Sequence, residues 1–314
     1  MIEILKYYFN KKNFGRFLKN ISKTFRRVLS RYKPVQIGEI ITLDGYKNCW
    51  VGYYDKSPFN PKDKNLLLIH ANNEVAYLPP KKNSKSDILI YDIEKKKKIL
   101  IGTTTAWNWQ QGARALWINE SEVIYNVYNE LSDSYHSVIK NIHTKKIIDI
   151  PYAVQDINNN TLVSIDYKRL KNIRPDYGYF SHEKGFNNKT SLFVVYDLKK
   201  RKVIYEFGED QAINQIVTSE LLDHNSLDKI KVNHMMISPD GRKIIYLLRY
   251  FINSTRVTDL YVFNLNNMSH DLLLKNANVS HCIWKDNHSI ILTCKNKYFG
   301  LNKLDINSKN IEPV

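Results

Sequence analysis

The sequence predicts an all-β protein built from a repeated four-stranded antiparallel unit, on the basis of three observations. The chain of 314 residues holds 21 Tyr and 12 Phe but only 11 Gly and 9 Pro, a composition that favours strands. Residues 232–266 carry Asp240-Gly241 between two apolar runs, which is the strongest short-range hairpin signal. The same order of runs and turns then recurs along the chain.

The clearest copy of the unit lies in residues 232–266. It consists of a short run opened by His234, a turn at Ser238-Pro239-Asp240-Gly241, an apolar run from Lys243 to Tyr250, and a third run from Asp259 to Leu265. Glycine suits this turn because it adopts the positive φ that a tight primed turn needs. Three antiparallel strands are therefore expected to follow one another without a helix between them.

Five copies of this pattern are visible, each ending its third strand on an Asp or Asn beside a Lys- or Asn-rich turn. These residues are Asp92, Asn141, Asp197, Asn264 and Asp305, at spacings of 41 to 67 residues. One four-stranded sheet cannot bury both of its faces alone, so the copies must stack, and radial stacking gives a β-propeller. The expected blades are 48–104, 112–151, 152–209, 229–276 and 279–314.

Two alternatives to a five-bladed ring remain open. The run VQIGEIITL at 35–43 is an extra strand that either pairs with the last blade or belongs to a sixth blade. A β-sandwich is the second candidate fold, and it is weaker because a sandwich does not require a repeated pattern of hairpins. The predicted domains are a basic helix at 1–34 and a propeller at 35–314.

The N-terminal segment has the pattern of a basic amphipathic helix. Its apolar residues follow helical spacing, at Phe14, Phe17, Leu18, Ile21, Phe25, Val28 and Leu29. Residues 1–33 carry ten Lys and Arg against the single acid Glu3, within a chain of formal charge +16. Such a helix either lies on an anionic membrane surface or docks its apolar stripe on the β domain.

Composition also narrows the cellular setting and the partners. Cys49, Cys282 and Cys294 lie far apart without metal spacing, which predicts buried free thiols in a reducing compartment. The expected location is the cytoplasm, with possible peripheral attachment to the inner membrane face through residues 1–33. A nucleic-acid partner is not expected, because the chain shows neither a basic face with base-stacking aromatics nor a known binding module.

Several stretches between Tyr53 and Cys294 resemble bacterial propellers related to oligogalacturonate lyase and, more distantly, the TolB-type and dipeptidyl-peptidase-type propellers. The stretches are YYDKSPFN from Tyr53, WNWQQGARALWI from Trp107, IDYKRLKNIRPDYGYF from Ile165, NHMMISPDGRKIIYLLRY from Asn233 and VSHCIWKDNHSIILTC from Val279. The WNWQQG and RPDYGY motifs resemble propellers associated with surface-polysaccharide biosynthesis.

This resemblance implies a sugar-acid lyase fold with a divalent metal such as Mn, held by histidines and a glutamine at the channel mouth. His234 and His281 match two of those histidines, each near the start of an innermost strand. The lyase has seven blades and takes further ligands from a C-terminal region that this sequence does not show. Two histidines are also fewer ligands than a typical metal site uses.

Equivalent positions of successive inner strands converge on one mouth of a propeller, which gives a predicted site. The expected catalytic residues are His234, His281, Arg174 and Tyr177, with His234 and His281 as metal ligands; the expected substrate-binding residues are Gln111, Arg114, Arg169 and Tyr179. Imidazoles suit a metal or a general base, arginines clamp carboxylates, and tyrosines stack on sugars or transfer protons. Arg169 and Arg174 are expected on an exposed loop.

Each of these residues also has a structural reading. A histidine that opens a buried strand often bonds a backbone carbonyl, and tyrosines or tryptophans often pack blades together. Two functions therefore stay open. The first is recognition of an acidic glycan or its precursor, with metal-assisted carbon–oxygen lyase chemistry on uronic acids. The second is a non-catalytic scaffold that binds a protein partner in glycan assembly at a membrane surface.

Overall fold

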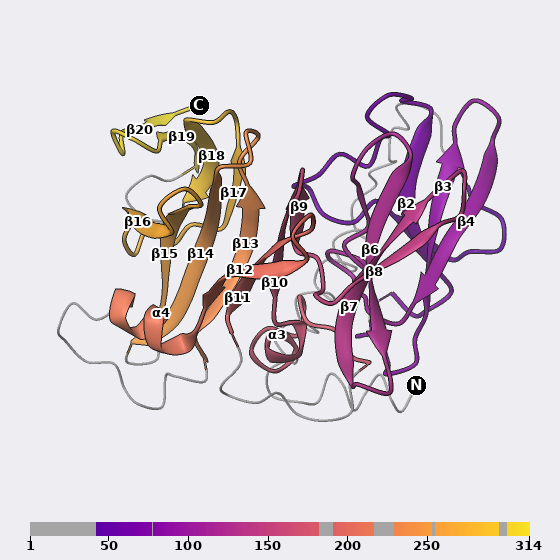
Figure 1. Ribbon diagram of the computed structural model, residues 1–314, viewed down its shortest axis with the longest axis horizontal. Coiled ribbons are helices and arrows are strands. Elements are labelled where there is room, and N and C mark those ends of the chain that lie inside the picture. The colour runs from indigo at the N-terminus through magenta and orange to yellow at the C-terminus, as the bar shows by residue number, and fades with distance from the viewer. Residues whose placement is uncertain (1–41, 77, 182–190, 217–228, 253–254, 295–299) are drawn as a thin grey trace, which may run out of the picture.

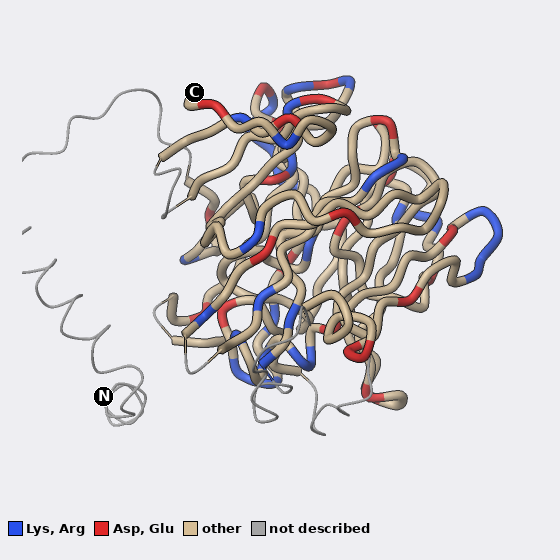
Figure 2. The backbone as a smooth tube through the Cα atoms, turned by 90° about the vertical axis from the view of Figure 1, so that its left-hand side faces the viewer, with Lys and Arg blue, Asp and Glu red and all other residues tan. Residues whose placement is uncertain are grey.

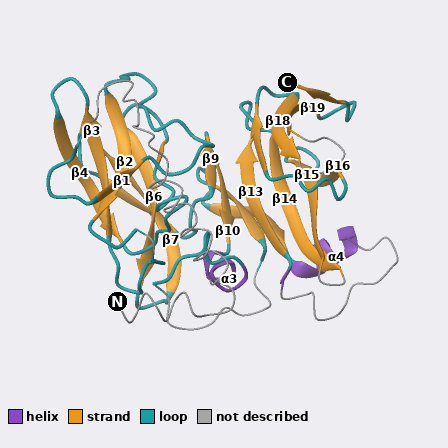
Figure 3. Cartoon of the chain, turned by 180° about the vertical axis from the view of Figure 1, so that it is seen from behind, coloured by secondary structure: helices purple, strands orange, loops and turns teal. Residues whose placement is uncertain are grey.

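The fold is a β-propeller of five four-stranded antiparallel sheets, each made of consecutive strands. The computed structural model describes residues 42–76, 78–181, 191–216, 229–252, 255–294 and 300–314. Within these residues the sheets follow one another along the molecule in chain order, from the indigo sheet to the yellow one (Figure 1). Strands make up nearly all of the regular structure (Figure 3). This confirms the predicted fold class.

The sheets are numbered in chain order. Sheet 1 holds β1 (Asn48–Trp50), β2 (Leu66–Asn72), β3 (Ser86–Asp92) and β4 (Lys97–Thr104). Sheet 2 holds β5 (Leu116–Trp117), β6 (Glu122–Asn129), β7 (Ser134–Asn141) and β8 (Ile147–Ile150). Sheet 3 holds β9 (Asp156–Asn158), β10 (Thr161–Ile165), β11 (Phe193–Asp197) and β12 (Lys202–Phe207). Sheet 4 holds β13 (Lys231–Ile237), β14 (Lys243–Ile252), β15 (Thr255–Asn264) and β16 (Ser269–Leu274). Sheet 5 holds β17 (His281–Trp284), β18 (Ser289–Cys294), β19 (Gly300–Asp305) and β20 (Ile311–Pro313).

The Asp or Asn that ends the third strand makes the same kind of hydrogen bond in all five sheets. Asp92, Asn141, Asp197, Asn264 and Asp305 each end the third strand, and the side chain of each accepts a backbone N–H from the turn that follows. This local bond stabilises the turn into the outermost strand. The recurring Asp or Asn in the sequence therefore marks the same hairpin turn in each sheet.

Each pair of consecutive sheets shares its own apolar core. Separate clusters join sheets 1 and 2 through Ile90 and Val123, sheets 2 and 3 through Ile124 and Leu162, sheets 3 and 4 through Phe193 and Tyr246, and sheets 4 and 5 through Ile245 and Ile290. Face-to-face stacking of successive blades is the packing of a propeller, and it excludes the two-layered sandwich. Among the described residues no such cluster joins sheet 5 to sheet 1.

Most of the tube through the five sheets is tan, and Lys, Arg, Asp and Glu positions are scattered along it and are frequent in the turns (Figure 2). No helix in the described part of the chain is long and apolar enough to cross a bilayer. The predicted basic helix at 1–34 and nearly all of the extra strand at 35–43 lie outside the described residues. Cys282 and Cys294 are buried as expected, but Cys49 is exposed, because it is the middle residue of the short edge strand β1, which pairs with β2 alone.

The turn between β13 and β14 differs in one detail from the expected hairpin. Gly241 does have a positive φ of 75°, but Pro239 and Asp240 at the centre of the turn do not. The Gly241 N–H donates to the Ser238 carbonyl at 2.9 Å, and Ser238 N–H to the Lys243 carbonyl at 2.8 Å. The connection is therefore an ordinary turn followed by a left-handed glycine, because proline cannot adopt the positive φ of a primed turn.

Two helices interrupt the strands in the described part of the chain, and neither was predicted from the sequence. The first, α3 (Tyr167–Ile173), begins after Asp166, whose side chain accepts the N–H groups of Lys168 and Arg169. It ends before Pro175, since proline disfavours helical backbone at the preceding residue. The second, α4 (Glu209–Ile216), follows β12 and carries two acids in its first turn, which suits the helix dipole.

Residues 53–56, here called the axial segment, touch the innermost region of all four other sheets. Asp55 pairs with Arg114 just before β5, and Lys56 pairs with Asp156 on β9 at 2.7 Å. The Tyr53 ring stacks on His234 of β13 with centroids 5.7 Å apart. The Tyr54 hydroxyl bonds the backbone of Cys282 on β17. The axis of the propeller is thus filled by a piece of its own first blade.

Candidate functional site

His234 and His281 lie side by side near the starts of β13 and β17. Their ring centroids are 5.2 Å apart, so the fold brings together two residues 47 positions apart in the sequence. The convergence follows from the radial arrangement, because β13 and β17 are the inner strands of adjacent sheets. His281 is exposed, whereas His234 is buried beneath it. The predicted meeting of these imidazoles is present in the structure.

Two tyrosines and an arginine complete this mouth, here called the histidine mouth. The Tyr177 ring meets His234 edge-on at 5.6 Å, and its hydroxyl lies 3.1 Å from that of Tyr53. The Arg174 guanidinium lies over the Tyr177 ring at 5.4 Å and pairs with Asp176 at 3.3 Å. All four predicted catalytic residues therefore lie together at the histidine mouth.

His234 is held in an unusual backbone conformation, and its pKa is strongly lowered. It sits at a bulge in β13 with φ of 53°, a left-handed value that a non-glycine residue adopts only when its surroundings impose it. Its Nδ1 is buried and has no hydrogen-bond partner among the described residues. Burial, with the nearby Arg249, His281 and Arg174, holds the pKa of His234 well below its usual value. The imidazole is neutral at pH 7.

These surroundings fit a divalent metal poorly. No third His, Cys, Asp or Glu joins the two histidines within the described ranges. The strongest charges acting on His234 are cationic, and they would repel a metal ion. Divalent first-row metals usually take three or four protein ligands in such sites. The divalent metal expected from the resemblance stays a prediction, and anion binding and elimination at this mouth can be considered without it.

Further cations lie next to the histidine mouth on sheet 4. Lys231 and Arg249 are both buried, and neither forms an ion pair with a described residue. Burial and the neighbouring arginines lower the pKa of Lys231 to about 7 and that of Arg249 to about 10. Sequence reasoning missed both residues. For Arg249 the available signal was a charged residue inside the apolar run YLLRYFI; Lys231 opens KVNHMMI and gave no such signal.

Two of the predicted substrate-binding residues have roles inside the protein. The Arg114 guanidinium is 2% exposed and donates to both carboxylate oxygens of Asp55, at 3.0 and 2.9 Å, and to the carbonyl of Gln155. Gln111 is also buried, and the Asn108 side chain accepts its backbone N–H. Nothing in this geometry presents either side chain to a ligand at the histidine mouth.

The other two predicted substrate-binding residues, Arg169 and Tyr179, are also buried inside the protein. Arg169 was expected on an exposed loop, but it lies on α3, is 2% exposed, pairs with Glu209 and donates to the Ile230 carbonyl. Tyr179 is fully buried, with its ring stacked on Tyr167 at 4.1 Å. The polar look of the segment misled the prediction, because helix α3 turns its Arg169 face toward the core.

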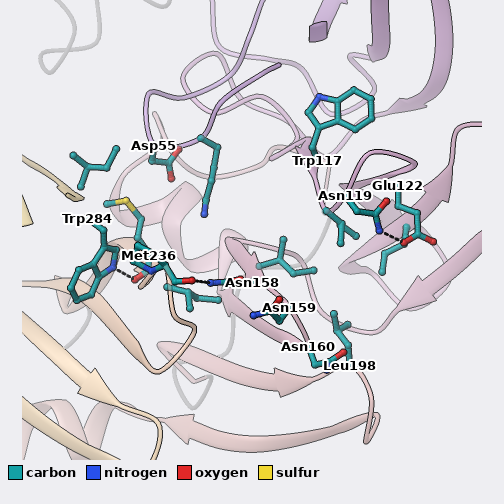
Figure 4. Close-up of a pocket in the computed structure, with 17 residues that line it drawn as sticks. Asp55, Trp117, Asn119, Glu122, Asn158, Asn159, Asn160, Leu198, Met236 and Trp284 are labelled. Carbon is teal, nitrogen blue, oxygen red and sulfur yellow. Dashed lines mark hydrogen bonds between the residues drawn. The ribbon is translucent and has the colours of Figure 1, made fainter. Parts of the chain in front are cut away.

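A second candidate site is a cavity at the opposite mouth, where the inner strands end. It measures about 810 Å³ and is lined by the axial segment and by sheets 2 to 5, including Trp117, Asn158 and Trp284 (Figure 4). Its polar groups already have partners: Asn158 donates to the Ser238 carbonyl, Trp284 to the Met236 carbonyl, and Asn119 to Glu122. We favour the histidine mouth as the functional site, because Nδ1 of His234 and Nε of Arg174 are buried there without a described hydrogen-bond partner, next to a second imidazole.

No protein-family model and no curated protein sequence matches this chain significantly. Among solved structures, it is similar to the β-propeller domain of the Trilobed protease from Pyrococcus furiosus, with 12% identity over 87% of this chain and 72% of that one, at a TM-score of 0.47. It is also similar to TolB from Acinetobacter baumannii, with 10% identity over 84% of this chain and 53% of that one, at 0.43. A third is oligogalacturonate lyase in complex with manganese, with 9% identity over 85% and 77%, at 0.41.

Proposed function

We propose that this protein binds an acidic glycan, or its precursor, of bacterial surface-polysaccharide metabolism at the histidine mouth. The observation that carries the proposal is the set of cations near His234: Arg249 forms no ion pair with a described residue, whereas Arg174 and Arg114 pair with Asp176 and Asp55. A cleft lined by one sign of charge concentrates ligands of the opposite sign. The natural occupant of this mouth is therefore an anion.

Aromatic rings at the same mouth favour a sugar over a small inorganic ion. Tyr54 is 44% exposed at the rim, and its ring meets His281 edge-on at 5.3 Å. Such a ring offers an apolar face beside a polar hydroxyl, which suits the mixed surface of a pyranose. Arg174 then supplies a planar fork for the carboxylate of a uronic acid.

Calorimetric titration with short oligogalacturonides and their methyl esters tests this proposal. Esterification removes the negative charge but keeps the sugar, so the ester should bind about tenfold more weakly or worse. Arg174→Gln should weaken binding of the acid by a similar factor, whereas Arg242→Gln on an exposed turn should leave it unchanged. Equal affinity for acid and ester would refute recognition of an acidic group.

A second candidate is elimination on the bound uronate, favoured by the rings of exposed His281 and of Tyr177, which both contact His234. One imidazole would take the proton from the carbon next to the carboxylate. That electron pair would form the C4=C5 double bond, the C4–O glycosidic bond would break, and the leaving oxygen would take a proton from the Tyr177 hydroxyl. Arg174 would stabilise the charge that builds on the carboxylate.

Ultraviolet absorbance of the unsaturated product measures this reaction directly. His281→Ala and Tyr177→Phe should abolish product formation while leaving glycan binding largely intact. Binding without product in the wild type would instead identify a recognition module, as the scaffold hypothesis holds. Metal content of the wild type and of the His234→Ala, His281→Ala double variant completes the test: equal content in both would exclude a metal held by these histidines.

A further inference from the structure

A row of polar side chains crosses three strands of sheet 4. Lys231 on β13 lies directly opposite Arg249 on β14, which lies directly opposite Thr258 on β15. Directly opposed residues of antiparallel strands project from the same face of a sheet, so the three form one row. All three are buried. Like charges directly opposite one another destabilise a sheet, so the pairing of Lys231 with Arg249 lowers the stability of the folded protein.

The row faces sheet 5, next to the histidine mouth. Arg249 Nη2 donates to the carbonyls of Val279 and Ser280, both at 3.2 Å, immediately before β17. The Ser280 hydroxyl in turn lies 2.8 Å from Nδ1 of His281. Ser280 thus links the polar row to the exposed imidazole of His281.

Several hydrogen-bonding atoms in this row have no partner among the described residues. They are Arg249 Nε, Thr258 Oγ1, and both amide atoms of Asn233, which lies two positions after Lys231 on β13. Each buried polar atom without a partner costs about 1–3 kcal/mol of stability. A bonded water would satisfy the hydroxyl or the amide, but it would not neutralise two buried cations.

Exposed cations extend the row to the surface. Lys229 and Arg256 are both exposed, and the Lys229 and Lys231 ammonium groups lie 5.4 and 5.9 Å from the Phe251 ring. Burial, then Arg249, Arg174, Arg256 and Arg169, lower the pKa of Lys231. A positive path therefore leads from solvent to the buried pair, as expected where an anion enters.

We propose that Lys231, Arg249, Thr258 and Asn233 form an oxyanion site between sheets 4 and 5, which takes a carboxylate, sulfate or phosphate group of the ligand. An ammonium, a guanidinium, a hydroxyl and an amide all offer donors to such a group. This inference rests on the proposed function, because the site would hold a second acidic group of a glycan whose first lies at Arg174. It also predicts that the natural ligand carries at least two acidic groups.

Thermal unfolding and calorimetry of the full chain with galacturonate, inorganic phosphate and sulfate test the site, with neutral galactose as the blank. Lys231→Met should raise the melting temperature of the ligand-free protein, since it removes a buried cation opposite Arg249. The same variant should lose about tenfold or more in oxyanion affinity, as should Thr258→Val to a smaller degree. Lys199→Met, in an exposed turn far from the row, should change neither quantity.

The two opposite effects of Lys231→Met separate a binding role from a structural one. A variant that is less stable and binds the anion as the wild type does would overturn the proposal, as would absence of saturable binding of all three oxyanions. Non-specific stabilisation by sulfate would appear equally in Lys231→Met, and so would also count against the site. The two proposals can fail separately. If Lys231→Met abolishes oxyanion binding while Arg174→Gln leaves oligogalacturonide binding unchanged, the oxyanion site is upheld and the proposed function is refuted. Comparison of galacturonate with phosphate and sulfate identifies which oxyanion the site prefers.

Discussion

The Tyr54 hydroxyl donates to the Cys282 carbonyl at 3.0 Å and accepts from the Cys282 N–H at 3.3 Å, which joins the first blade to the innermost strand of the last. No shared strand or apolar cluster joins these two sheets within the described residues. Among the described residues, the axial segment therefore connects these two sheets across the axis.

Tyr54→Phe should lower the free energy of unfolding by about 1 kcal/mol, because it removes one hydroxyl that serves two backbone groups. Hydrogen exchange should speed up mainly in β17 and β18. Tyr46→Phe is the matched control, since the Tyr46 hydroxyl bonds Asp87 within sheet 1. Equal exchange effects of both variants on sheet 5 would contradict a role for Tyr54 in joining the blades.

Gly241→Val should lower the free energy of unfolding by about 1 kcal/mol or more, because Gly241 has a φ of 75° that a β-branched residue rarely adopts. Space is not the reason, since a Cβ placed there would meet its nearest atom, Asn159 Nδ2, at 3.7 Å. Gly241→Asn should be milder, because asparagine tolerates the left-handed region. Chemical denaturation measures both, and a neutral Val variant would argue against backbone strain.

Acid should destabilise the protein between pH 6.5 and about 4 through His70. This buried ring accepts the Ala113 N–H at Nε2 at 3.0 Å, and burial lowers its pKa to about 4. The unfolded chain binds a proton below pH 6.5 while the folded one does not, so stability is full above pH 6.5 and falls toward pH 4. The loss is about 2–3 kcal/mol. Unfolding of His70→Gln, measured across this range, should show a shallower fall.

The control for that experiment is His143→Gln, at an exposed turn residue, which should reproduce the wild-type curve. Buried His234 and half-buried His270 have pKa values lowered in the same direction, to about 4 for His270, so part of the acid sensitivity should survive in His70→Gln. A wild-type curve that is flat between pH 6.5 and 4 would contradict the neutral state of all three rings.

Oxyanion affinity should fall as the pH rises above about 7. The pKa of Lys231 in the free protein is about 7, so its charge is present below that value and lost above it. The charged groups that act on it are Arg249, Arg174, Arg256 and Arg169, and the carboxylates of Asp176 and Glu209 pair with two of these arginines. Lys231→Arg keeps the charge at every pH, so its affinity for galacturonate should stay constant where that of the wild type falls about tenfold. Parallel curves would exclude Lys231 as the titrating group.

The basic N-terminal segment leads to a prediction about membranes. We propose that residues 1–33 bind anionic lipid surfaces, because each basic side chain near such a surface contributes about 1 kcal/mol. Replacing Arg16, Lys19, Lys23 and Arg26 by Glu in the full chain should abolish flotation with anionic liposomes and leave binding to neutral ones unchanged. Retention on anionic liposomes would favour the alternative, in which the helix docks on the β domain.

Local patterns in the sequence were sufficient to predict the blades. Strand alternation, the Asp or Asn that ends each third strand, and Gly241 all act through neighbours a few residues away, and the five sheets lie within the five predicted ranges. The meeting of His234 and His281 was also predictable, because equivalent positions of adjacent inner strands must converge once the blades stack. Helix α3 was missed because its cap, Asp166, resembles an ordinary turn residue.

By itself, then, the sequence determined that the chain would form a radial repeat with two histidines near its axis. Only the tertiary structure decided what fills that axis and which charges remain without partners there. Arg114 and Arg169 look alike as candidates in the sequence, yet each meets a carboxylate from a distant segment, Asp55 or Glu209, whereas Lys231 and Arg249 meet none among the described residues. Whether a charge is compensated depends on which distant segments the fold brings to it, and no local pattern encodes that.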